Sequence, residues 1–426
     1  MKTLRIFCRV FIGLLFIFSG YVKAIDPVGS QIIFTEDFKA FGWDFFVPFS
    51  MFFGVALSTV ELLIGCCALL GIRMKETAWI NLLFMSFMTI FTLILAVFNP
   101  VTDCGCFGEA IKLTNWETFF KNILLIMPIS VVMFWQRNNY KSVAPCRVEW
   151  ITTACFTILI LFLIHYSYRH LPLIDFMSYK VGTNIEEAMS YPEDAAPDVY
   201  ETILHYEKDG KIQDFTIQNL PDSTWKFVDA VTRLVKKGYE PPIHDFVILS
   251  HAGDDITDYV LNLDGYVFLL VMPHVEKASL KHKDAINALA DYCLTQENTH
   301  FYALSSSGDE ALIKYARESG AMYPFHIVDE KPLMSMVRSN PGLFLMKDAV
   351  VLAKWSHYDI PTPEELNAKI LSQSPEKIIM NYELKERLTS ELIAAALFIA
   401  MILWGIICRK IYRKNGNKAE LFTEKV

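Results

Sequence analysis

The sequence has few charged residues for its length. Of its 426 residues, 20% are Asp, Glu, Lys or Arg, whereas a soluble globular domain carries about 25%. Apolar residues make up 53% of the chain and lie in continuous runs rather than in short periodic segments. These two features exclude a purely soluble protein. The 32 Phe, 18 Tyr and 8 Trp residues exclude a disordered one.

The sequence also lacks an excess of positive charge. Its formal net charge is −8, which gives nucleic acid no overall electrostatic attraction, so we expect no nucleic-acid partner. The acidic residues are concentrated between residues 171 and 388, where 34 Asp and Glu face 20 Lys and Arg. The rest of the chain is basic. Such a distribution is typical of a membrane protein with one large water-soluble domain.

Six apolar runs are long enough to cross a lipid bilayer, whose core needs about 20 residues of helix. They cover residues 4–22, 47–70, 78–97, 119–135, 150–166 and 388–408. Lys and Arg residues cluster before the first run, between the second and third, between the fourth and fifth, and after the sixth. Because basic loops stay in the cytoplasm, both termini are predicted to be cytoplasmic. The loops 23–46 and 98–118 and the block 167–387 then lie outside the cytoplasmic membrane.

The first run has no small-x-small cleavage site, so we expect it to remain as a span rather than to be removed as a signal peptide. The chain is then divided into six parts. They are a four-helix unit (1–140), a fifth helix (148–167), a tether with a small β-rich piece (171–240), an α/β domain (241–385), a sixth helix (388–408) and a basic cytoplasmic tail (409–426).

Strands and helices alternate in the block outside the membrane. Within the tether, two alternating segments flank Lys208-Asp209-Gly210, which is a hairpin signal. Beyond Pro241-Pro242, strands are predicted at 246–249, 265–272, 300–305, 325–328, 343–346 and 349–355, and helices at 255–261, 278–296, 309–319 and 363–371. This order predicts an α/β layer domain that ends in a hairpin and a helix.

The α/β domain resembles the thioredoxin fold in its membrane-tethered, TlpA-like form. Asn340-Pro341-Gly342 stands where that family carries its cis-proline. The resemblance implies a Cys-x-x-Cys pair after the strand 265–272, but this sequence has Pro273-His274-Val275-Glu276 there. The only cysteine of the block is Cys293, interpreted as a buried apolar residue. Because a disulfide cycle needs two thiols, we expect a non-catalytic domain whose Pro341 shapes a peptide-binding groove.

Most of the nine cysteines fall in predicted spans. Those in spans are Cys8, Cys66, Cys67, Cys155 and Cys408, and Cys146 is predicted to be cytoplasmic. The neighbours Cys66 and Cys67 point in different directions on a helix, which is more typical of packing than of a redox pair.

Cys104-Gly105-Cys106-Phe107-Gly108, hereafter the CGCFG loop, is different. It follows the third run on the predicted outer side, where disulfides persist. Two cysteines that flank one glycine can close a small, strained ring, and strained disulfides are the more oxidising ones. Gly105 and Gly108 give the backbone freedom for a tight turn. We interpret Cys104 and Cys106 as a redox pair; the alternative is a static staple, although so small a ring removes little chain entropy.

Three motifs together resemble the MauE family, which belongs with the DoxX-like membrane proteins. They are Gly20-x-x-Lys23-x-x-Asp26-Pro27, Glu61-x-x-x-Gly65 and the CGCFG loop. The resemblance covers about residues 1–140 and implies a four-helix unit that serves the maturation or transport of a disulfide-rich partner outside the membrane. The family is named for methylamine utilisation, but nothing in this sequence indicates that metabolism.

Glu61 is an ionisable residue within the second span, where such residues usually face the bundle interior. It could pass protons to a reducible carrier such as a quinone, or it could form a structural hydrogen bond to a neighbouring helix. No motif specifies a quinone, and no other cofactor is evident. Lys23 and Asp26 are expected to form an ion pair at i,i+3 spacing. His274, Glu276 and His282 fit no common metal site.

The sequence therefore predicts a membrane-embedded helper of extracytoplasmic thiol–disulfide chemistry, or of the maturation of a partner protein. Cys104 and Cys106 would carry the chemistry, and the α/β domain would hold the client protein or peptide. One alternative is a non-enzymatic scaffold in which the CGCFG loop is only structural. Another is small-molecule transport with Glu61 as a proton site, which no inverted repeat supports. The client, the electron carrier and the oligomeric state are left open.

Overall fold

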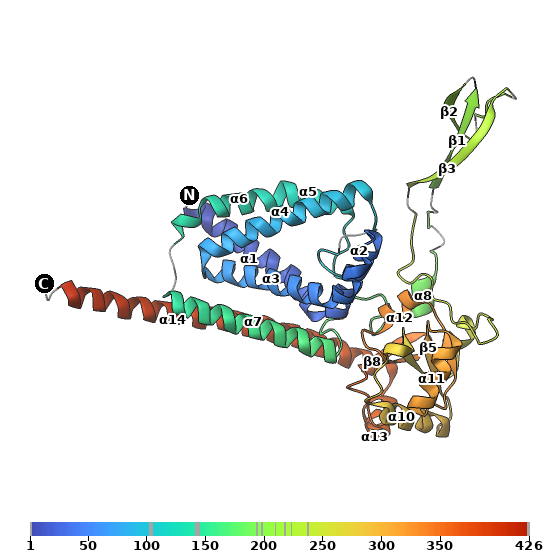
Figure 1. The fold of residues 1–426 in the computed structure, drawn as a ribbon. Helices are drawn as coiled ribbons and strands as arrows, with labels where there is room; N and C mark the ends of the chain where they lie inside the picture. The colour runs from blue at the N-terminus through green and yellow to red at the C-terminus, as the bar shows by residue number, and fades with distance from the viewer. Residues whose placement is uncertain are drawn as a thin grey trace.

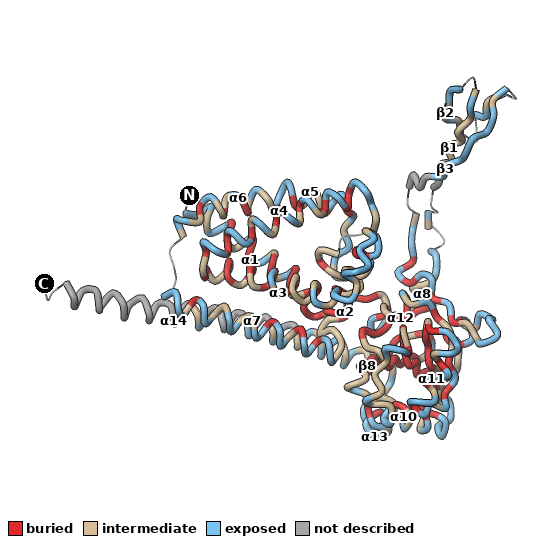
Figure 2. Tube along the Cα trace, viewed as in Figure 1, coloured by how far each residue is buried: buried red, intermediate tan, exposed pale blue. Residues whose placement is uncertain are grey.

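The computed structural model describes residues 2–101, 105–140, 145–192, 195–196, 199–208, 210–216, 219–222, 224–236 and 238–423. A helical bundle comes first, followed by a narrow three-stranded sheet, a mixed α/β domain and a long C-terminal helix (Figure 1). Buried residues concentrate in the α/β domain and on the facing sides of the bundle helices (Figure 2).

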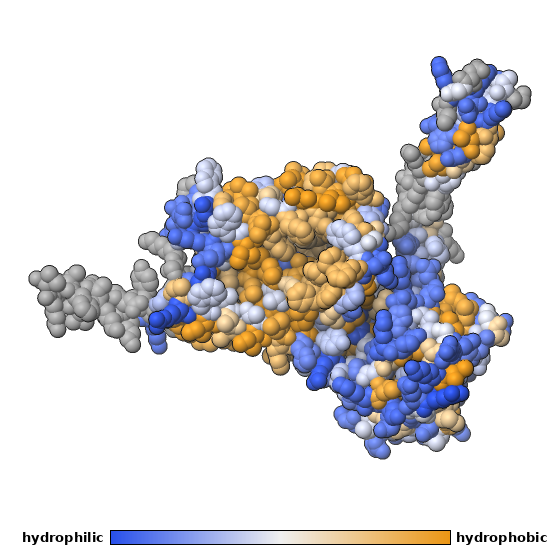
Figure 3. Space-filling model, viewed as in Figure 1, coloured by the Kyte–Doolittle hydropathy of each residue, from blue (hydrophilic) through white to orange (hydrophobic). Residues whose placement is uncertain are grey.

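Within the described residues, five helical segments are long and apolar enough to cross a membrane. They are Lys2–Ile25 (α1), Asp44–Leu70 (the short η1, Asp44–Phe49, and α3, Ser50–Leu70), Met74–Phe98 (α4), Asn115–Trp135 and Cys146–Arg169 (α7). The fourth segment comprises α5 (Asn115–Phe120), the π-helical η2 (Lys121–Ile126) and α6 (Met127–Trp135). Large apolar side chains are exposed on the outside of the bundle, among them Leu83 and Phe87 of α4 and Leu124 of η2. Figure 3 shows this surface as mostly apolar. The protein is thus a multi-pass integral membrane protein.

The sixth predicted span, residues 388–408, lies within α14 (Pro375–Thr423) and is helical throughout. Many of its side chains are outside the described part of the chain, so its membrane crossing stays a prediction. The predicted sidedness of the membrane likewise stays a prediction. The loops after α1, α4 and α7 meet at one end of the bundle, beside the α/β domain (Figure 1).

Glycines allow α1 and α3 to pack closely. A Cβ atom at Gly20 would lie 2.8 Å from the backbone nitrogen of Leu62, and one at Gly65 would lie 2.7 Å from that of Ile17. Small residues at such contacts let two backbones approach each other within a membrane. The close approach brings the polar side chains at the end of α1 against Glu61 of α3.

A short helix that was not predicted follows α1. It is α2 (Pro27–Ala40), and the side chain of Asp26 caps it by accepting a hydrogen bond of 2.8 Å from the backbone N–H of Gly29. Proline at the first turn and aspartate at the N-cap both favour a helix start. The chain therefore turns sharply after α1, and Asp26 belongs to the next element.

The three-stranded sheet extends away from the α/β domain (Figure 1). Its strands are β1 (Val199–Lys208), β2 (Lys211–Thr216) and β3 (Lys226–Lys236), antiparallel in the order β2-β1-β3. Lys208 pairs with Lys211, which confirms the predicted hairpin; its Asp209 lies outside the described residues. The third strand was not predicted.

A five-stranded sheet forms the centre of the α/β domain, in the order β6-β5-β4-β7-β8. Its strands are β4 (Tyr266–Met272), β5 (Thr299–Ser305), β6 (Phe325–Ile327), β7 (Gly342–Lys347) and β8 (Val350–Ser356). The first three are parallel, and β7 is antiparallel to both β4 and β8. Its helices are α8 (Ile185–Met189), α9 (Thr257–Leu261), α10 (Lys283–Thr295), α11 (Asp309–Ser319), α12 (Glu330–Met336) and α13 (Pro363–Leu366), which continues into the π-helical η5 (Asn367–Leu371).

Successive residues of β4 enter two hydrophobic cores on opposite faces of this sheet. Leu269 lies in one core and Leu270 in the other, both fully buried, as expected for a central strand. The strand order and connections confirm the predicted thioredoxin-like layers. The Asn340–Pro341 peptide bond is cis, at the position where the sequence places it.

Two local predictions are wrong. Residues 246–249 form no strand: only Leu249 makes isolated bridges, to Asp255 and Ile327, while Phe246 and Ile248 enter the core from irregular backbone. A short apolar run does not by itself distinguish a strand from other buried backbone. The helix predicted from Ala278 begins only at Lys283, after a 3-10 turn at Val275–Lys277 (η4).

Candidate functional site

The CGCFG loop lies at the end of the bundle that faces the α/β domain. Cys104 is outside the described residues, so the structure does not test its pairing with Cys106. Gly105 and Gly108 have φ angles of +59° and +53°, in the left-handed region. A Cβ atom at Gly105 would also lie 2.6 Å from Cδ1 of Ile33 on α2. The loop therefore depends on these two glycines, as predicted from the need for a tight turn.

Phe107 fixes the loop on the bundle. Its side chain is buried, and its ring lies 5.7 Å from that of Phe18 on α1. The ammonium group of Lys121, in η2, lies 4.2 Å from the centre of the Phe107 ring. This cation–π contact joins the loop to the fourth span.

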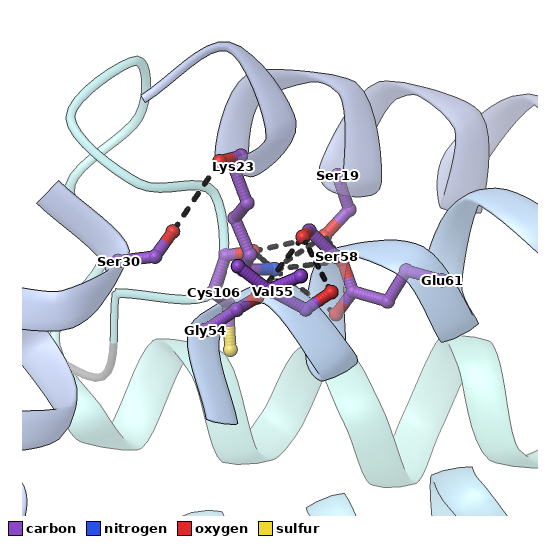
Figure 4. A network of polar contacts seen from close by, with 8 residues as sticks. All are labelled: Ser19, Lys23, Ser30, Gly54, Val55, Ser58, Glu61 and Cys106. Atoms are coloured by element: carbon purple, nitrogen blue, oxygen red, sulfur yellow. Dashed lines mark hydrogen bonds and ion pairs between the residues drawn. The ribbon is translucent and has the colours of Figure 1, made fainter. Parts of the chain in front are cut away.

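A buried ion pair lies directly beneath the loop. Lys23 Nζ is 2.8 Å from Glu61 Oε2 and 3.0 Å from Oε1, and both side chains are only 5% exposed (Figure 4). The predicted pairing of Lys23 with Asp26 is wrong. Helix α1 ends at Ile25, so the two residues belong to different elements, and Lys23 points across to α3.

Ser19 completes the network. Its hydroxyl oxygen accepts a hydrogen bond of 2.9 Å from Lys23 Nζ and lies 2.9 Å from both Glu61 Oε2 and the carbonyl oxygen of Cys106. Because a hydroxyl has one proton to donate, it serves one of these two acceptors at a time. Lys23 Nζ also donates to the Cys106 carbonyl. The three N–H donors of Lys23 are thereby used on Glu61, Ser19 and Cys106.

This arrangement anchors the backbone of Cys106 to charges inside the membrane region. Burying two charges is costly, and the cost is offset only where hydrogen bonds satisfy both groups. Of the two interpretations of Glu61, the hydrogen bond to a neighbouring helix is what the geometry contains. Its role in proton transfer stays a prediction.

Arg338 joins the bundle to the α/β domain. It lies between α12 and β7, three residues before Pro341, and its side chain is 5% exposed. Its Nε is 3.1 Å from Asp26 Oδ2, and its Nη2 is 3.6 Å from Oε1 of Glu109, the residue after the CGCFG loop. A third nitrogen donates to the Met334 carbonyl at 2.9 Å. One cation thus connects the start of α2, the CGCFG loop and the segment leading to Pro341.

Two further contacts tie the end of α7 to the segment after β8. His170 Nδ1 lies 2.8 Å from Asp359 Oδ1, and the guanidinium of Arg169 lies 4.9 Å from the centre of the Tyr358 ring. A buried pair, Lys354 Nζ to Asp175 Oδ2 at 2.7 Å, holds the tether against β8. The pKa of Lys354 is lowered by burial, which the nearby Asp175 carboxylate opposes.

Polar groups replace the redox pair at the end of β4. His274 Nε2 lies 3.0 Å from Glu330 Oε1, and the His274 carbonyl accepts a hydrogen bond from the side chain of Asn340 at 2.8 Å. Glu276 accepts a hydrogen bond of 2.8 Å from the Ser307 hydroxyl, and its own backbone amide and that hydroxyl lower its pKa. His274 and Glu276 thus have side-chain partners, whereas Oδ1 of Asn340 is buried without a hydrogen-bond partner among the described residues.

Cys293 lies on α10, not at the end of β4 where the redox pair of a thioredoxin would be. Its side chain is 1% exposed, and burial raises its pKa to about 12. A thiol that stays protonated and buried does not attack disulfides. The interpretation of Cys293 as a packing residue is therefore confirmed.

Two family models match parts of the chain. Residues 1–136 match the family described as methylamine utilisation protein MauE, and residues 200–237 match a domain of unknown function, DUF8463. No curated protein matches the sequence. A solution structure described as a putative protein disulfide isomerase from Bacteroides thetaiotaomicron is similar over 30% of this chain and 83% of the other, with 15% identity and a TM-score of 0.25.

The strand order of the α/β domain is what identifies its fold, since three parallel strands followed by an antiparallel hairpin form its sheet. The bundle is identified by the family match over its first four spans. The N-terminal membrane region, residues 1–136, is thus similar to the MauE family, and a domain with a thioredoxin-like fold follows it in the same chain.

Proposed function

We propose that this protein is a membrane-embedded helper of thiol–disulfide chemistry outside the cytoplasm. Cys104 and Cys106 alternate between dithiol and disulfide on behalf of a partner protein. The observation that carries the proposal is the anchoring of the Cys106 carbonyl by the buried Lys23–Glu61 pair and Ser19. A costly buried charge pair that contacts the backbone of a cysteine is more typical of a functional site than of a surface staple.

The α/β domain supports this assignment of roles. Its single cysteine is buried, so the CGCFG loop is the one place on the predicted outer side where two cysteines are close in sequence. Arg338 links that loop to the segment leading to Pro341. We assign to the α/β domain the binding of the client, through the groove beside Pro341.

Thiol trapping in intact cells tests the proposal. Cells that express the full chain are treated with a membrane-permeant alkylating mass tag after growth with and without added reductant. The redox role predicts that the protein carries two more alkylated thiols after growth with reductant than after growth without it. This difference should be lost in a variant with Cys104→Ser and Cys106→Ser. Cys293→Ser is the matched control and should leave the change intact. A pair that stays oxidised in every condition contradicts the proposal.

A scaffold that brings client proteins together is the second candidate. It is favoured by the exchange of the redox pair for His274 and Glu276, whose hydrogen bonds leave the fold intact without its usual chemistry. The same tagging can compare the thiol state of extracytoplasmic proteins in three strains. These strains carry the wild-type protein, a deletion of the protein, and the variant with Cys104→Ser and Cys106→Ser. If the deletion changes their thiol state and the serine variant does not, the scaffold is the better description.

A further inference from the structure

The three-stranded sheet of β1, β2 and β3 stands apart from the rest of the protein. It extends away from the α/β domain, and none of its described side chains is buried (Figures 1 and 2). None of its described residues belongs to any of the hydrophobic cores of the bundle or of the α/β domain. The surfaces of this sheet are therefore free to contact a partner.

An aromatic cluster holds the three strands together at the hairpin end of the sheet. The ring of Tyr206 on β1 lies 5.7 Å from that of Phe215 on β2 and 5.6 Å from that of Phe227 on β3. The ring of Trp225, just before β3, lies 5.2 Å from that of Phe215. Aromatic pairs at such separations stabilise a fold beyond their buried area. The sheet thus has packing of its own, and its two edges are defined surfaces.

The two edge strands differ in length and in protection. Strand β2 has six residues, of which Lys211 and Asp214 are charged, whereas β3 has eleven residues. Between its terminal lysines, β3 contains one Asp, one Arg, no proline and no glycine, and its Val228 and Val231 are 46% and 37% exposed. Short strands, lysines and prolines protect an edge from pairing with another chain. The edge of β3 has little such protection.

The sequence of β3 is complementary to itself in antiparallel order. When Val231 of one copy stands opposite Val231 of another, residue 229 of each copy stands opposite residue 233 of the other. Each Asp229 is then opposite an Arg233, and this happens twice because the arrangement is symmetric. The only like charges, Lys226 and Lys236, come opposite each other at the ends of the strands. Cross-strand pairs of opposite charge stabilise a sheet.

We propose that the β3 edge is an interface between two copies of this chain, which pair antiparallel about Val231. The two sheets then form one six-stranded sheet in the order β2-β1-β3-β3-β1-β2. The unpaired backbone groups of both β3 edges hydrogen-bond to each other, and both Asp229–Arg233 pairs fix the register. This inference goes beyond the proposed function and does not rest on it.

The position of the sheet suits two chains in one membrane. Figure 1 shows the sheet beyond the outline of the bundle, with its strands running across the direction of the bundle helices. Two chains inserted in the same direction are related by a two-fold axis along the membrane normal, and antiparallel pairing of identical strands needs a two-fold axis across the strands. Both conditions can be met together, with the two bundles apart from each other. Confinement to one membrane also raises the effective concentration of the second copy.

Disulfide crosslinking of the full chain in isolated membranes tests the interface. Residues directly opposite each other in paired strands are close enough for a disulfide, so Val231→Cys should give a dimer band on oxidation that reductant removes. Gln213→Cys is the matched control, since Gln213 is exposed on the open edge of β2. The wild type gives the background from the native cysteines. Equal crosslinking of Val231→Cys and Gln213→Cys, no dimer above background, or crosslinking of Val231→Cys to another protein each overturns the proposal.

Charge reversal tests the register in the same assay. In chains that carry Val231→Cys, Asp229→Arg or Arg233→Asp alone turns both pairs into like-charge pairs and should slow crosslinking about tenfold. A mixture of the two variants, coexpressed with different tags, restores opposite charges in both pairs, so the two should crosslink to each other as fast as unreversed chains. This recovery also shows that each variant is folded. Unchanged rates for the single variants, or no recovery in the mixture, overturns the proposed pairing.

Discussion

The α/β domain and the CGCFG loop divide between them what a thioredoxin usually combines. The α/β domain has the fold, including a cis bond before Pro341, but at the end of β4 it has His274 and Glu276, which hydrogen-bond to Glu330 and Ser307, in place of a cysteine pair. The loop has the two cysteines but no such fold, and its backbone is anchored by an ion pair of the bundle. The comparison teaches that a fold can keep its shape without the residues that carry its usual chemistry.

The largest effect is expected from breaking the ion pair of the bundle. Lys23→Met leaves Glu61 buried without its cation, and removing one partner of such a pair destabilises a protein by about 3–5 kcal/mol. The double variant with Lys23→Met and Glu61→Leu should recover part of this loss. Thermal unfolding of the purified chain in one detergent measures both. A double variant no more stable than the single one would show that the contact with the Cys106 carbonyl matters more than the pair.

Gly105 offers a sharper test of the loop itself. Gly105→Ala places a Cβ in a left-handed conformation, which costs about 1–2 kcal/mol, and brings it against Ile33. We expect lower stability and a lower fraction of interconverting thiols. Gly108→Ala is the matched control, since it has the same φ sign but its nearest contact, Val22, would be 3.2 Å away. Equal effects at both positions would mean that backbone strain alone is responsible.

A smaller loss of stability is expected when the contact between the bundle and the α/β domain is removed. Arg338→Ala removes the contacts with the carboxylates of Asp26 and Glu109, which are 17% and 32% exposed, so solvent screens both pairs and their loss should cost about 1 kcal/mol. The change should expose the tether to limited proteolysis. Lys331→Ala is the control: Lys331 is 85% exposed and 3.9 Å from Glu36, and surface pairs contribute about 0–1 kcal/mol. Unchanged proteolysis of Arg338→Ala would show that His170 and Asp359 alone hold the domain in place.

The smallest expected effect is a pH dependence confined to the α/β domain. Burial, with the nearby His282 and Lys281, lowers the pKa of His357 from its ordinary value of 6.5 to about 4. The folded domain therefore binds this proton less readily than the unfolded chain. Stability from the neutral imidazole is complete above pH 6.5 and is lost as the pH falls toward 4.

His357→Phe removes this titration. Its unfolding midpoint should fall less between pH 7 and pH 5 than that of the wild type, measured in parallel on the full chain. Ser339 would lose a hydrogen bond of 2.9 Å in this variant at every pH, so the comparison concerns the difference between the two pH values. An identical fall in both proteins would assign the pH dependence to other groups.

Much of this fold follows from sequence patterns of short range. Continuous apolar runs locate the five spans, and β4, β5 and α11 appear in the sequence with nearly the observed limits, whereas α10 begins later than predicted. The short α2 was missed because its apolar residues form no clear stripe. Strand β3 was missed because its residues alternate only in part.

The sequence predicts which residues form the site but not which residues they contact. The sequence predicts Lys23, Asp26 and Glu61 as site residues, but the pairing of Lys23 with Asp26 is wrong because it requires one helix through both residues, whereas α1 ends at Ile25 and Asp26 caps α2. Arg338 gave no signal, since 312 positions separate it from Asp26. Contacts of this kind depend on how two domains pack, and a single sequence does not show that packing.

The Arg338 contact has a consequence for the encounter between client and loop. A client peptide bound beside Pro341 would be carried on the same rigid connection that fixes Glu109 after the CGCFG loop. Its cysteines would then meet the loop at an effective concentration on the order of millimolar, as for short linkers. Even a client that is scarce and weakly reactive in solution would be presented repeatedly to the same two sulfur atoms before it dissociates.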